Sequence, residues 1–282
     1  MPGTYAEDFS FLNAWGIQYN IDIIGQSRTG SIIKPLNNPW RSSEPGYKSC
    51  IHLSDGMFFR NLTVQGILDI SGSIGVGITD SLIDAAAATG YGAGIMSHYP
   101  QKLTIDNVEI ISDGDGMWLY NYWDVDNIVL NNIRIRLTAP EHGGIWIFPS
   151  QATPIKFTNL NITGLAGGQA MAFFSYWSGL VELDNFTVNG QIPVFAYGGS
   201  GTISVNARHS NFNSTGSLIA VGSGSLDFTI DNSVINGTVA STGSPVKIGN
   251  SKITGGIQGG SGLVTTINSY GGSYQAIQNG TF

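Results

Sequence analysis

Apolar and polar residues alternate along most of the chain, and a recurring asparagine interrupts the alternation. In residues 155–162, apolar side chains alternate up to Asn159 and resume one step out of phase after it. Similar units, some looser, are centred on Asn61, Asp80, Asn107, Asn132, Asn159, Asn185, Asn211, Asn232, Asn250 and Asn268, which lie 18 to 27 residues apart. Period-two alternation predicts strands. A strand repeat of this length predicts a solenoid, because one repeat buries its apolar face only against its neighbours.

The asparagine suits the turn between two strands. Asn tolerates left-handed backbone better than most residues, and its amide can bond to the Asn of the next coil, about 4.8 Å away. We therefore expect an internal asparagine ladder in an all-β solenoid of about ten coils. His209 falls on an inward position of the pattern, matching Phe157 and Leu183, which predicts a core histidine.

Composition favours one elongated domain, with residues 1–49 as a lead-in and first coil, continuous with a solenoid over residues 50–282. The 39 glycines and 11% charged residues are typical of short strands and tight turns.

A net charge of −7 argues against binding to nucleic acid, anionic membranes or strongly polyanionic ligands. No apolar run is long enough for membrane insertion. The single cysteine, Cys50, excludes an intrachain disulfide and is expected to be a buried thiol.

The N-terminal region carries a family resemblance. Pro2-Gly3-Thr4-Tyr5 is followed by an Ile-rich strand, a glycine turn at Gly30 and a second strand. This resembles the opening of the pectin-lyase-like family of right-handed parallel β-helices, and the glycine-rich, weakly charged chain is most similar to bacteriophage tailspike shafts. The resemblance implies a right-handed parallel β-helix in a virion tail or outside the cell, with polysaccharide as partner. Because neither end carries an obvious cap, we expect a homo-oligomer, a trimer by this resemblance, or a piece of a larger protein.

A second set of strands, one before each asparagine unit, carries aromatic residues. They are expected at residues 95–98, 117–120, 145–148, 171–174, 194–197 and 218–221. In each, the first and third residues are expected to point inward and the second and fourth outward. The outward set is Met96, His98, Trp118, Tyr120, Trp146, Phe148, Phe174, Phe195 and Tyr197. Such a stripe fits stacking against sugar rings, and equally fits packing under long turns or against another subunit.

Acidic residues precede two of these strands. Asp113 and Glu141 both lie four residues before a strand start, with Asp115 beside the first. Stacked coils would bring two carboxylates within the separation that glycoside hydrolysis requires, so Asp113, Asp115 and Glu141 are the catalytic candidates. Asp124 and Asp126 form a second acid cluster. The alternative is that these acids only bond to turn amides. No metal or other cofactor is implied.

Three functional hypotheses remain open. The first is a β-helix that binds cell-surface polysaccharide through the aromatic stripe, with or without hydrolysing it. The second is a non-catalytic structural or receptor-binding shaft, in which the aromatics form subunit contacts. The third is a secreted polysaccharide lyase, for which the acidic charge and the missing basic motif are unfavourable.

Glu109 and Arg134 share an outward register and are expected to pair weakly across coils.

Overall fold

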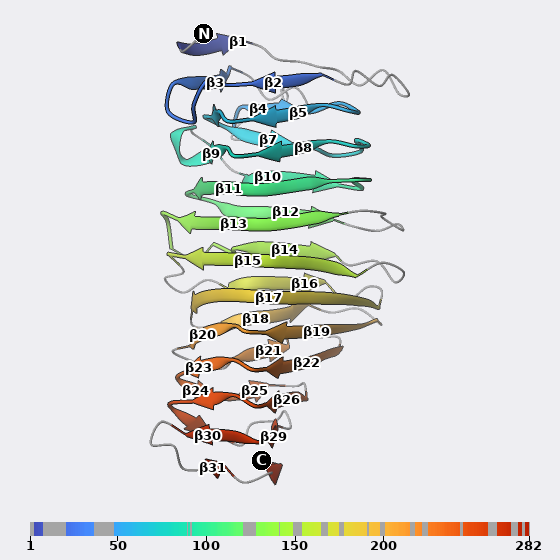
Figure 1. Ribbon diagram of the computed structural model, residues 1–282, viewed down its shortest axis with the longest axis vertical. Helices are drawn as coiled ribbons and strands as arrows, with labels where there is room; N and C mark the ends of the chain where they lie inside the picture. Colours follow the sequence, from blue (N-terminus) through green and yellow to red (C-terminus); the bar gives the residue numbers. More distant parts are fainter. Residues whose placement is uncertain are drawn as a thin grey trace.

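The computed structural model describes residues 3–7, 21–36, 48–88, 90, 92–120, 128–140, 142–148, 154–164, 169–174, 178–190, 192–197, 201–214, 218–221, 225–242, 245–258, 264–271, 276–277 and 280–281. These residues form strands and turns, with one short 3₁₀ helix, η1 (Ala85–Ala87). Figure 1 shows an elongated stack of strands with the two ends of the chain at opposite ends of the column. The predicted all-β solenoid is therefore confirmed.

One side of the column is a sheet of nine parallel strands. Each strand pairs with the equivalent strand of the next coil, so neighbours in space are about 20 residues or more apart in sequence in most cases. In spatial order they are β4 (Cys50–His52), β7 (Ile67–Asp69), β10 (Ala93–His98), β12 (Asp115–Tyr120), β14 (Ile145–Phe148), β16 (Gln169–Phe174), β18 (Ile192–Tyr197), β21 (Ile219–Val221) and β25 (Ser241–Thr242).

The other side is a bent sheet of two arms that meet at the turn residues. Four long strands cross the bend: β11 (Thr104–Ser112), β13 (Val129–Leu137), β15 (Ile155–Thr163) and β17 (Gly179–Gly190). The first arm also contains β2 (Asp22–Ile24), β5 (Phe58–Arg60), β8 (Gly77–Thr79), β19 (Thr202–Arg208), β22 (Ser225–Asp231), β26 (Val246–Gly249) and β29 (Val264–Ile267). The second arm contains β1 (Gly3–Glu7), β3 (Ser31–Pro35), β6 (Thr63–Val64), β9 (Leu82–Asp84), β20 (Asn211–Ser214), β23 (Val234–Asn236), β27 (Lys252–Ile253) and β30 (Ser269–Gly271).

The winding is right-handed. In Figure 1 the near strands such as β13 and β15 run to the left, the fainter strands behind them run to the right, and the chain descends with each coil. This is the hand that parallel crossover connections almost always adopt. The structure is thus the expected right-handed parallel β-helix.

Inward side chains of all three faces fill the space between the sheets. Ile95, Phe157 and Leu160, from different faces, belong to one continuous core and are at most 1% exposed. Aromatic rings meet edge to face in the core: Phe186 and Phe212 have centroids 5.6 Å apart, and Phe212 and Phe228 have centroids 6.0 Å apart. Burial against the coils above and below is what makes each short strand stable.

The turn ladder exists, but it lies outside the core. The residues Asn61, Asp80, Asn107, Asn132, Asn159, Asn185, Asn232, Asn250 and Asn268 all have φ between 47° and 58°, as the prediction required. Asn159 and Asn185 are nevertheless exposed, and the residue after each of them points inward. The expectation of an internal ladder is wrong, because the left-handed residue reverses the side-chain alternation and turns its own side chain toward solvent.

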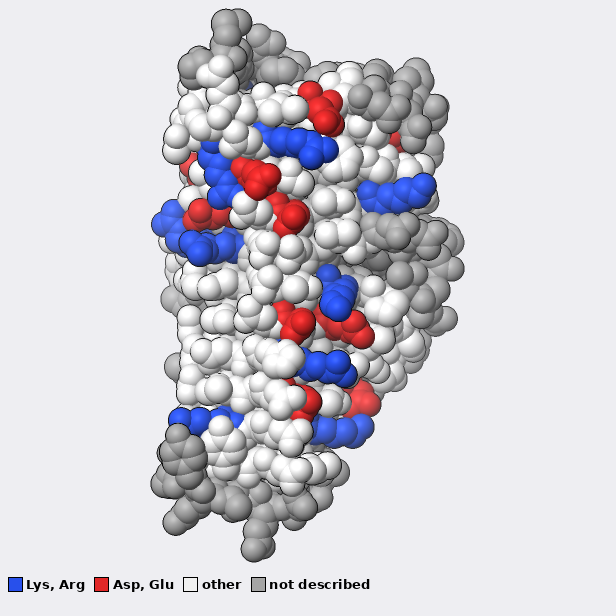
Figure 2. Space-filling model, in the orientation of Figure 1, with Lys and Arg blue, Asp and Glu red and all other residues white. Residues whose placement is uncertain are grey.

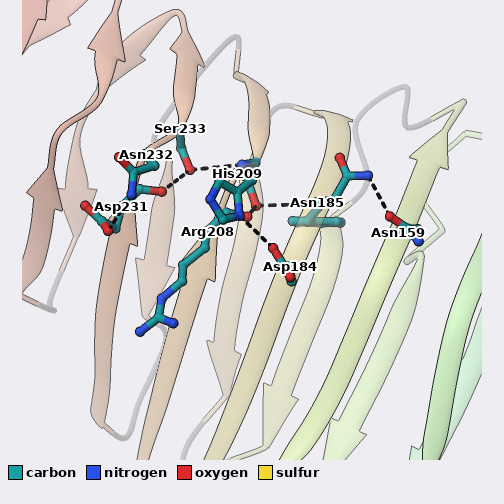
Figure 3. Close-up of polar contacts among 10 residues, drawn as sticks. Asn159, Asp184, Asn185, Arg208, His209, Asp231, Asn232 and Ser233 are labelled. Atoms are coloured by element: carbon teal, nitrogen blue, oxygen red, sulfur yellow. Dashed lines mark hydrogen bonds and ion pairs between the residues drawn. The ribbon is translucent and has the colours of Figure 1, made fainter.

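His209, and not Asn211, occupies the ladder position of its coil. The histidine has φ 50°, and the register pairs Ala207 with Leu183. His209 is therefore not a core residue: its side chain is 63% exposed, and its Nδ1 lies 2.8 Å from Asp184 Oδ1 (Figure 3). Histidine is among the non-glycine residues that adopt left-handed backbone more readily, which explains how it replaces asparagine here.

The C-terminal coil is covered by strands of reversed direction. β31 (Ala276–Ile277) pairs antiparallel with β30, and β32 (Gly280–Thr281) pairs antiparallel with β29. These strands cover the outer edges of β29 and β30, contrary to the expectation that this end carries no cap, and the expected homo-oligomer stays a prediction. A separate pair, β24 (Thr238–Val239) with β28 (Gly256–Ile257), forms a third sheet. In the described part of the chain, no helix has the length and apolarity needed to cross a membrane.

Candidate functional site

The outer face of the nine-stranded sheet carries the aromatic residues that the pattern placed there. Met96, Trp118 and Trp146 are partners in register on β10, β12 and β14. The intervening inward residues are completely buried, which confirms the alternation on these three strands. His98, Tyr120 and Phe148 form a second row, two residues further along the same strands.

The second row is a continuous set of ring contacts across three coils. His98 meets Tyr120 edge to face, with centroids 4.3 Å apart, and Tyr120 lies 4.4 Å from Phe148 at a tilt of 53°. Trp118 joins from the first row, 6.1 Å from Tyr120. These separations fall in or close to the range that stabilises aromatic pairs, so the rings support one another as one surface.

This surface is only partly open. Trp118 and Phe148 keep 9% and 8% of their surface exposed, whereas Met96, His98, Tyr120 and Trp146 have intermediate exposure. Trp118 and Phe148 are therefore largely packed against other residues, whereas the other four side chains are accessible to a ligand. We name these four residues, together with Trp118 and Phe148, the aromatic face.

The remaining stripe residues are only partly placed. Phe174 and Tyr197 are register partners on β16 and β18, as expected, but their side chains, like that of Phe195, are outside the described residues. On β21 the predicted alignment is wrong by one residue, because Ile219 rather than Leu218 pairs with Val194.

Asp115 is a buried carboxylate at the start of β12 that fixes one side of the aromatic face. Its Oδ2 accepts a hydrogen bond of 2.7 Å from Trp118 Nε1, and its Oδ1 accepts one of 2.8 Å from the Gly143 amide. His142 Nδ1 lies 3.8 Å from the same Oδ1. At Gly143 an added Cβ would lie 2.4 Å from Trp146 Nε1, so a larger residue there would displace the Trp146 indole. The carboxylate thus orients the Trp118 indole and links two coils.

Asp113 has a cationic partner. Lys48, whose side chain is completely buried, donates from Nζ to Asp113 Oδ1 at 2.5 Å and to the carbonyls of Ala85 and Ala88 at 2.7 and 2.6 Å. The Asp113 side chain remains 42% exposed. Removing one partner of such a pair leaves a buried charge uncompensated, so Asp113 serves at least as the counter-ion of Lys48.

The other acidic candidates are not placed. Glu141, Asp124 and Asp126 are outside the described residues, so their distances from Asp113 and Asp115 stay predictions. Within the described residues, no group of three or more His, Cys, Asp or Glu side chains is arranged to hold a metal ion.

The sequence reasoning missed a polar extension of the first row. His52 and Asp69 are register partners on β4 and β7, and Asp69 is in turn the partner of Met96. His52 Nδ1 lies 3.4 Å from Asp69 Oδ2, and both side chains are buried. The register of outward positions, followed from Met96 to the two preceding coils, leads to Asp69 and then His52.

Cys50 lies two residues before His52 and is buried, as expected. Burial, with a smaller contribution from the Asp69 charge, raises the pKa of its thiol to about 12. At neutral pH the thiol is protonated and unreactive.

Comparisons with known proteins identify the fold but no family. No family model matches the chain, and no curated protein matches it in sequence. A crystal structure of PfbA, a surface adhesin of Streptococcus pneumoniae, aligns with a TM-score of 0.51 and 11% identity over 96% of this chain and 81% of that one. A second PfbA structure aligns with a TM-score of 0.40 and 14% identity, over 96% of this chain and 82% of that one.

The catalytic domain of a GH87 α-1,3-glucanase in complex with nigerose aligns with a TM-score of 0.44 and 13% identity, over 96% of this chain and 59% of that one. At these identities a structural likeness indicates a shared fold and nothing about activity.

Proposed function

We propose that this protein binds polysaccharide on the aromatic face of the nine-stranded sheet. The observation that carries the proposal is the contact of His98, Tyr120 and Phe148 across three coils, with Trp146 partly exposed beside them. Sugar rings present apolar C–H faces that stack on aromatic rings, and a rigid parallel sheet repeats the ring positions at about 4.8 Å per coil. An extended chain of sugars fits such a row.

The charge distribution restricts the glycan. The chain carries a net charge of −7, and Asp115 and Asp113 lie at the edge of the aromatic face. A strongly anionic polymer would be repelled, so neutral or weakly charged glycans are the class we propose.

Binding is tested by removing one ring at a time. Trp146→Ala is expected to weaken binding of a polysaccharide, identified by screening glycans, by about 1 to 3 kcal/mol through lost stacking and apolar burial. The matched control is Tyr270→Ala, which removes a partly exposed aromatic from β30 of the bent sheet. Titration calorimetry measures both variants. Equal affinities of wild type and Trp146→Ala would place the glycan elsewhere.

Hydrolysis is the second candidate, because Asp113 is partly exposed two residues before the carboxylate that holds Trp118. If Asp113 and Glu141 cleave the glycan, Glu141→Gln and Asp113→Asn each abolish most release of reducing ends while binding persists. Asp113→Asn also removes the partner of Lys48, so its melting temperature must be measured beside its activity. A loss of activity in both variants without loss of fold is the result that supports catalysis.

The setting we propose is an extracellular or virion surface, where the chain forms part of a tailspike-like spike, as a homotrimer. Support comes from the resemblance of its sequence to tailspike shafts. In the competing arrangement of a non-catalytic shaft, the aromatic face is covered by a neighbouring subunit and no glycan binds. Light scattering at micromolar concentration distinguishes monomer from trimer, and glycan binding by the same assembly distinguishes the two functions.

A further inference from the structure

A concave site lies on the bent sheet, away from the aromatic face. A cavity of about 380 Å³ opens where the second arm leaves the turn ladder on β11, β13 and β15. Its size is within the range of small-molecule pockets. Figure 2 shows basic and acidic side chains gathered in the upper left of this face, and the nine-stranded sheet lies behind it in the view of Figure 1.

Three polar side chains from successive coils line the cavity. Glu109, Arg134 and Asn161 are register partners on β11, β13 and β15 and point outward from the second arm. Glu109 and Arg134 are neighbours, yet they form no ion pair within 4.0 Å, so the expected pairing is wrong; neither side chain has a hydrogen bond within the described part of the chain. Asn161 Oδ1 is buried and accepts no hydrogen bond from any described residue. These groups are available to a ligand.

The edges of the cavity are already ordered. Arg28 reaches across from the turn before β3 and donates from Nε to the Asp80 carbonyl at 2.7 Å and from Nη2 to the Asn107 carbonyl. On the opposite edge, Asn159 Nδ2 donates to Asn132 Oδ1 at 2.9 Å. A ligand would therefore meet a prearranged site, which reduces the entropy lost on binding.

The chemistry of the lining points to a neutral, hydroxyl-rich ligand. Arg134 and the asparagine amides can donate hydrogen bonds to a ligand, whereas Glu109 and Asn161 Oδ1 can accept them. A sugar hydroxyl both donates and accepts, so adjacent hydroxyls can bond to an alternating set of this kind. The charges of Glu109 and Arg134 offset each other, and the third charged group of the lining, Arg28, is already bonded to two backbone carbonyls. The groups left to bind a ligand therefore carry no net charge, which disfavours a strongly charged ligand.

We propose that this cavity binds one neutral pyranose unit, at a site separate from the aromatic face. The site uses other strands and other residues than the polysaccharide proposal and does not depend on it. Without an aromatic platform the affinity is expected in the millimolar range.

Nuclear magnetic resonance of the ¹⁵N-labelled full chain tests the site, with methyl α-D-glucopyranoside and methyl β-D-galactopyranoside as probes. The expected result is a saturable shift of the Asn161 side-chain amide and the Arg134 Nε–H resonance with at least one probe. Arg134→Ala is expected to weaken binding about tenfold or more, since bonds to a charged donor are stronger than neutral ones. Glu109→Gln, which preserves shape, is expected to weaken it less.

Arg136→Ala is the matched control. Arg136 is the next outward residue of β13, exposed like Arg134, and does not line the cavity. Its replacement should leave the titration unchanged. The proposal fails if neither glycoside shifts the two resonances at up to about 100 mM. It fails equally if acetate or glucuronate shifts them and the neutral glycosides do not, which would indicate an anion site. Both outcomes leave binding at the aromatic face unaffected.

Discussion

The middle coils and the C-terminal coils make the same turn with different chemistry. In the middle coils the ladder asparagine precedes a buried apolar residue: Val108, Ile133, Leu160 and Phe186. In the C-terminal coils the ladder residue precedes a buried serine: Ser210, Ser233, Ser251 and Ser269. One position of the repeat thus separates the middle coils from the C-terminal coils, and the serine form also occurs once before the middle coils, at Ser81.

In the middle coils the polar bonds of the turn lie on the outside. Asn159 Nδ2 donates to Asn132 Oδ1 at 2.9 Å, and Asn185 Nδ2 donates to Asn159 Oδ1 at 2.7 Å. These side chains are exposed, so water competes for each bond and its net contribution is modest. Stability at this corner comes from the apolar residue that follows.

In the C-terminal coils the polar bonds lie inside. Ser233 Oγ donates to the Asp231 carbonyl at 2.7 Å and accepts the Ser210 amide at 3.0 Å. Ser251 repeats the arrangement one coil later, accepting the Ser233 amide at 3.1 Å. A small hydroxyl fills less space than leucine or phenylalanine, and the last ladder residues, Asn232, Asn250 and Asn268, are only 18 residues apart. The two narrowest coils at the C-terminal end have a serine corner, whereas both candidate binding sites lie on the wide middle coils.

The largest expected effect is on the apolar corner. Leu160→Ala removes a side chain that is 1% exposed and should destabilise the fold by about 2 to 5 kcal/mol, as lost burial and cavity formation combine. Urea unfolding measures the change. A loss below about 1 kcal/mol would mean that the middle coils collapse around the gap and that the corner is not rigid.

A smaller loss is expected at the serine corner. Ser233→Ala leaves the Ser210 amide and the Asp231 carbonyl without their buried partner, at about 1 to 3 kcal/mol. Ser204→Ala, on the outer surface of β19, is the control and should change stability by less than about 0.5 kcal/mol. Equal effects at the two serines would show that the buried hydroxyl of Ser233 stabilises its corner no more than an outer-surface hydroxyl does.

The smallest effect is expected at the exposed ladder. Asn159→Leu forces a side chain with no local bond into left-handed backbone at φ 55° and should cost about 1 to 2 kcal/mol. Asn159→Gly adopts this backbone freely and should cost less than about 1 kcal/mol. The pair separates the backbone requirement from the amide bonds. If glycine is as harmful as leucine, the external bonds stabilise the turn more than the backbone does.

The repeat made the fold predictable, because a period-two pattern broken at a fixed residue type leaves few other architectures. Alternation alone did not predict that the ladder side chains point to solvent, because the left-handed residue Asn159 inverts the side-chain alternation. His209 was misplaced for a related reason. The repeat was aligned on asparagine, which gave Asn211, but the turn requires a residue with positive φ, and His209 adopts this backbone.

The candidate site was predictable in outline only. Alternation gave the outward direction of Trp118 and Trp146, because it depends on neighbouring residues in one strand. The ion pair between Lys48 and Asp113 joins residues 65 positions apart, and no local pattern indicates it. The cavity beside Arg134 is likewise formed by Arg28, which comes from another coil. Such contacts depend on which residues the stacked coils bring together, and the repeat pattern within one coil does not indicate them.

The central claim is that glycan binds to the aromatic face of the middle coils, and a crystal structure with a bound oligosaccharide tests it most directly. The account predicts a sugar ring stacked on Trp146, within about 4 Å of the indole plane, and further units following Tyr120 and His98 along the sheet. A neighbouring subunit packed on these rings in the solution assembly, or an oligosaccharide bound elsewhere with the rings untouched, would contradict it.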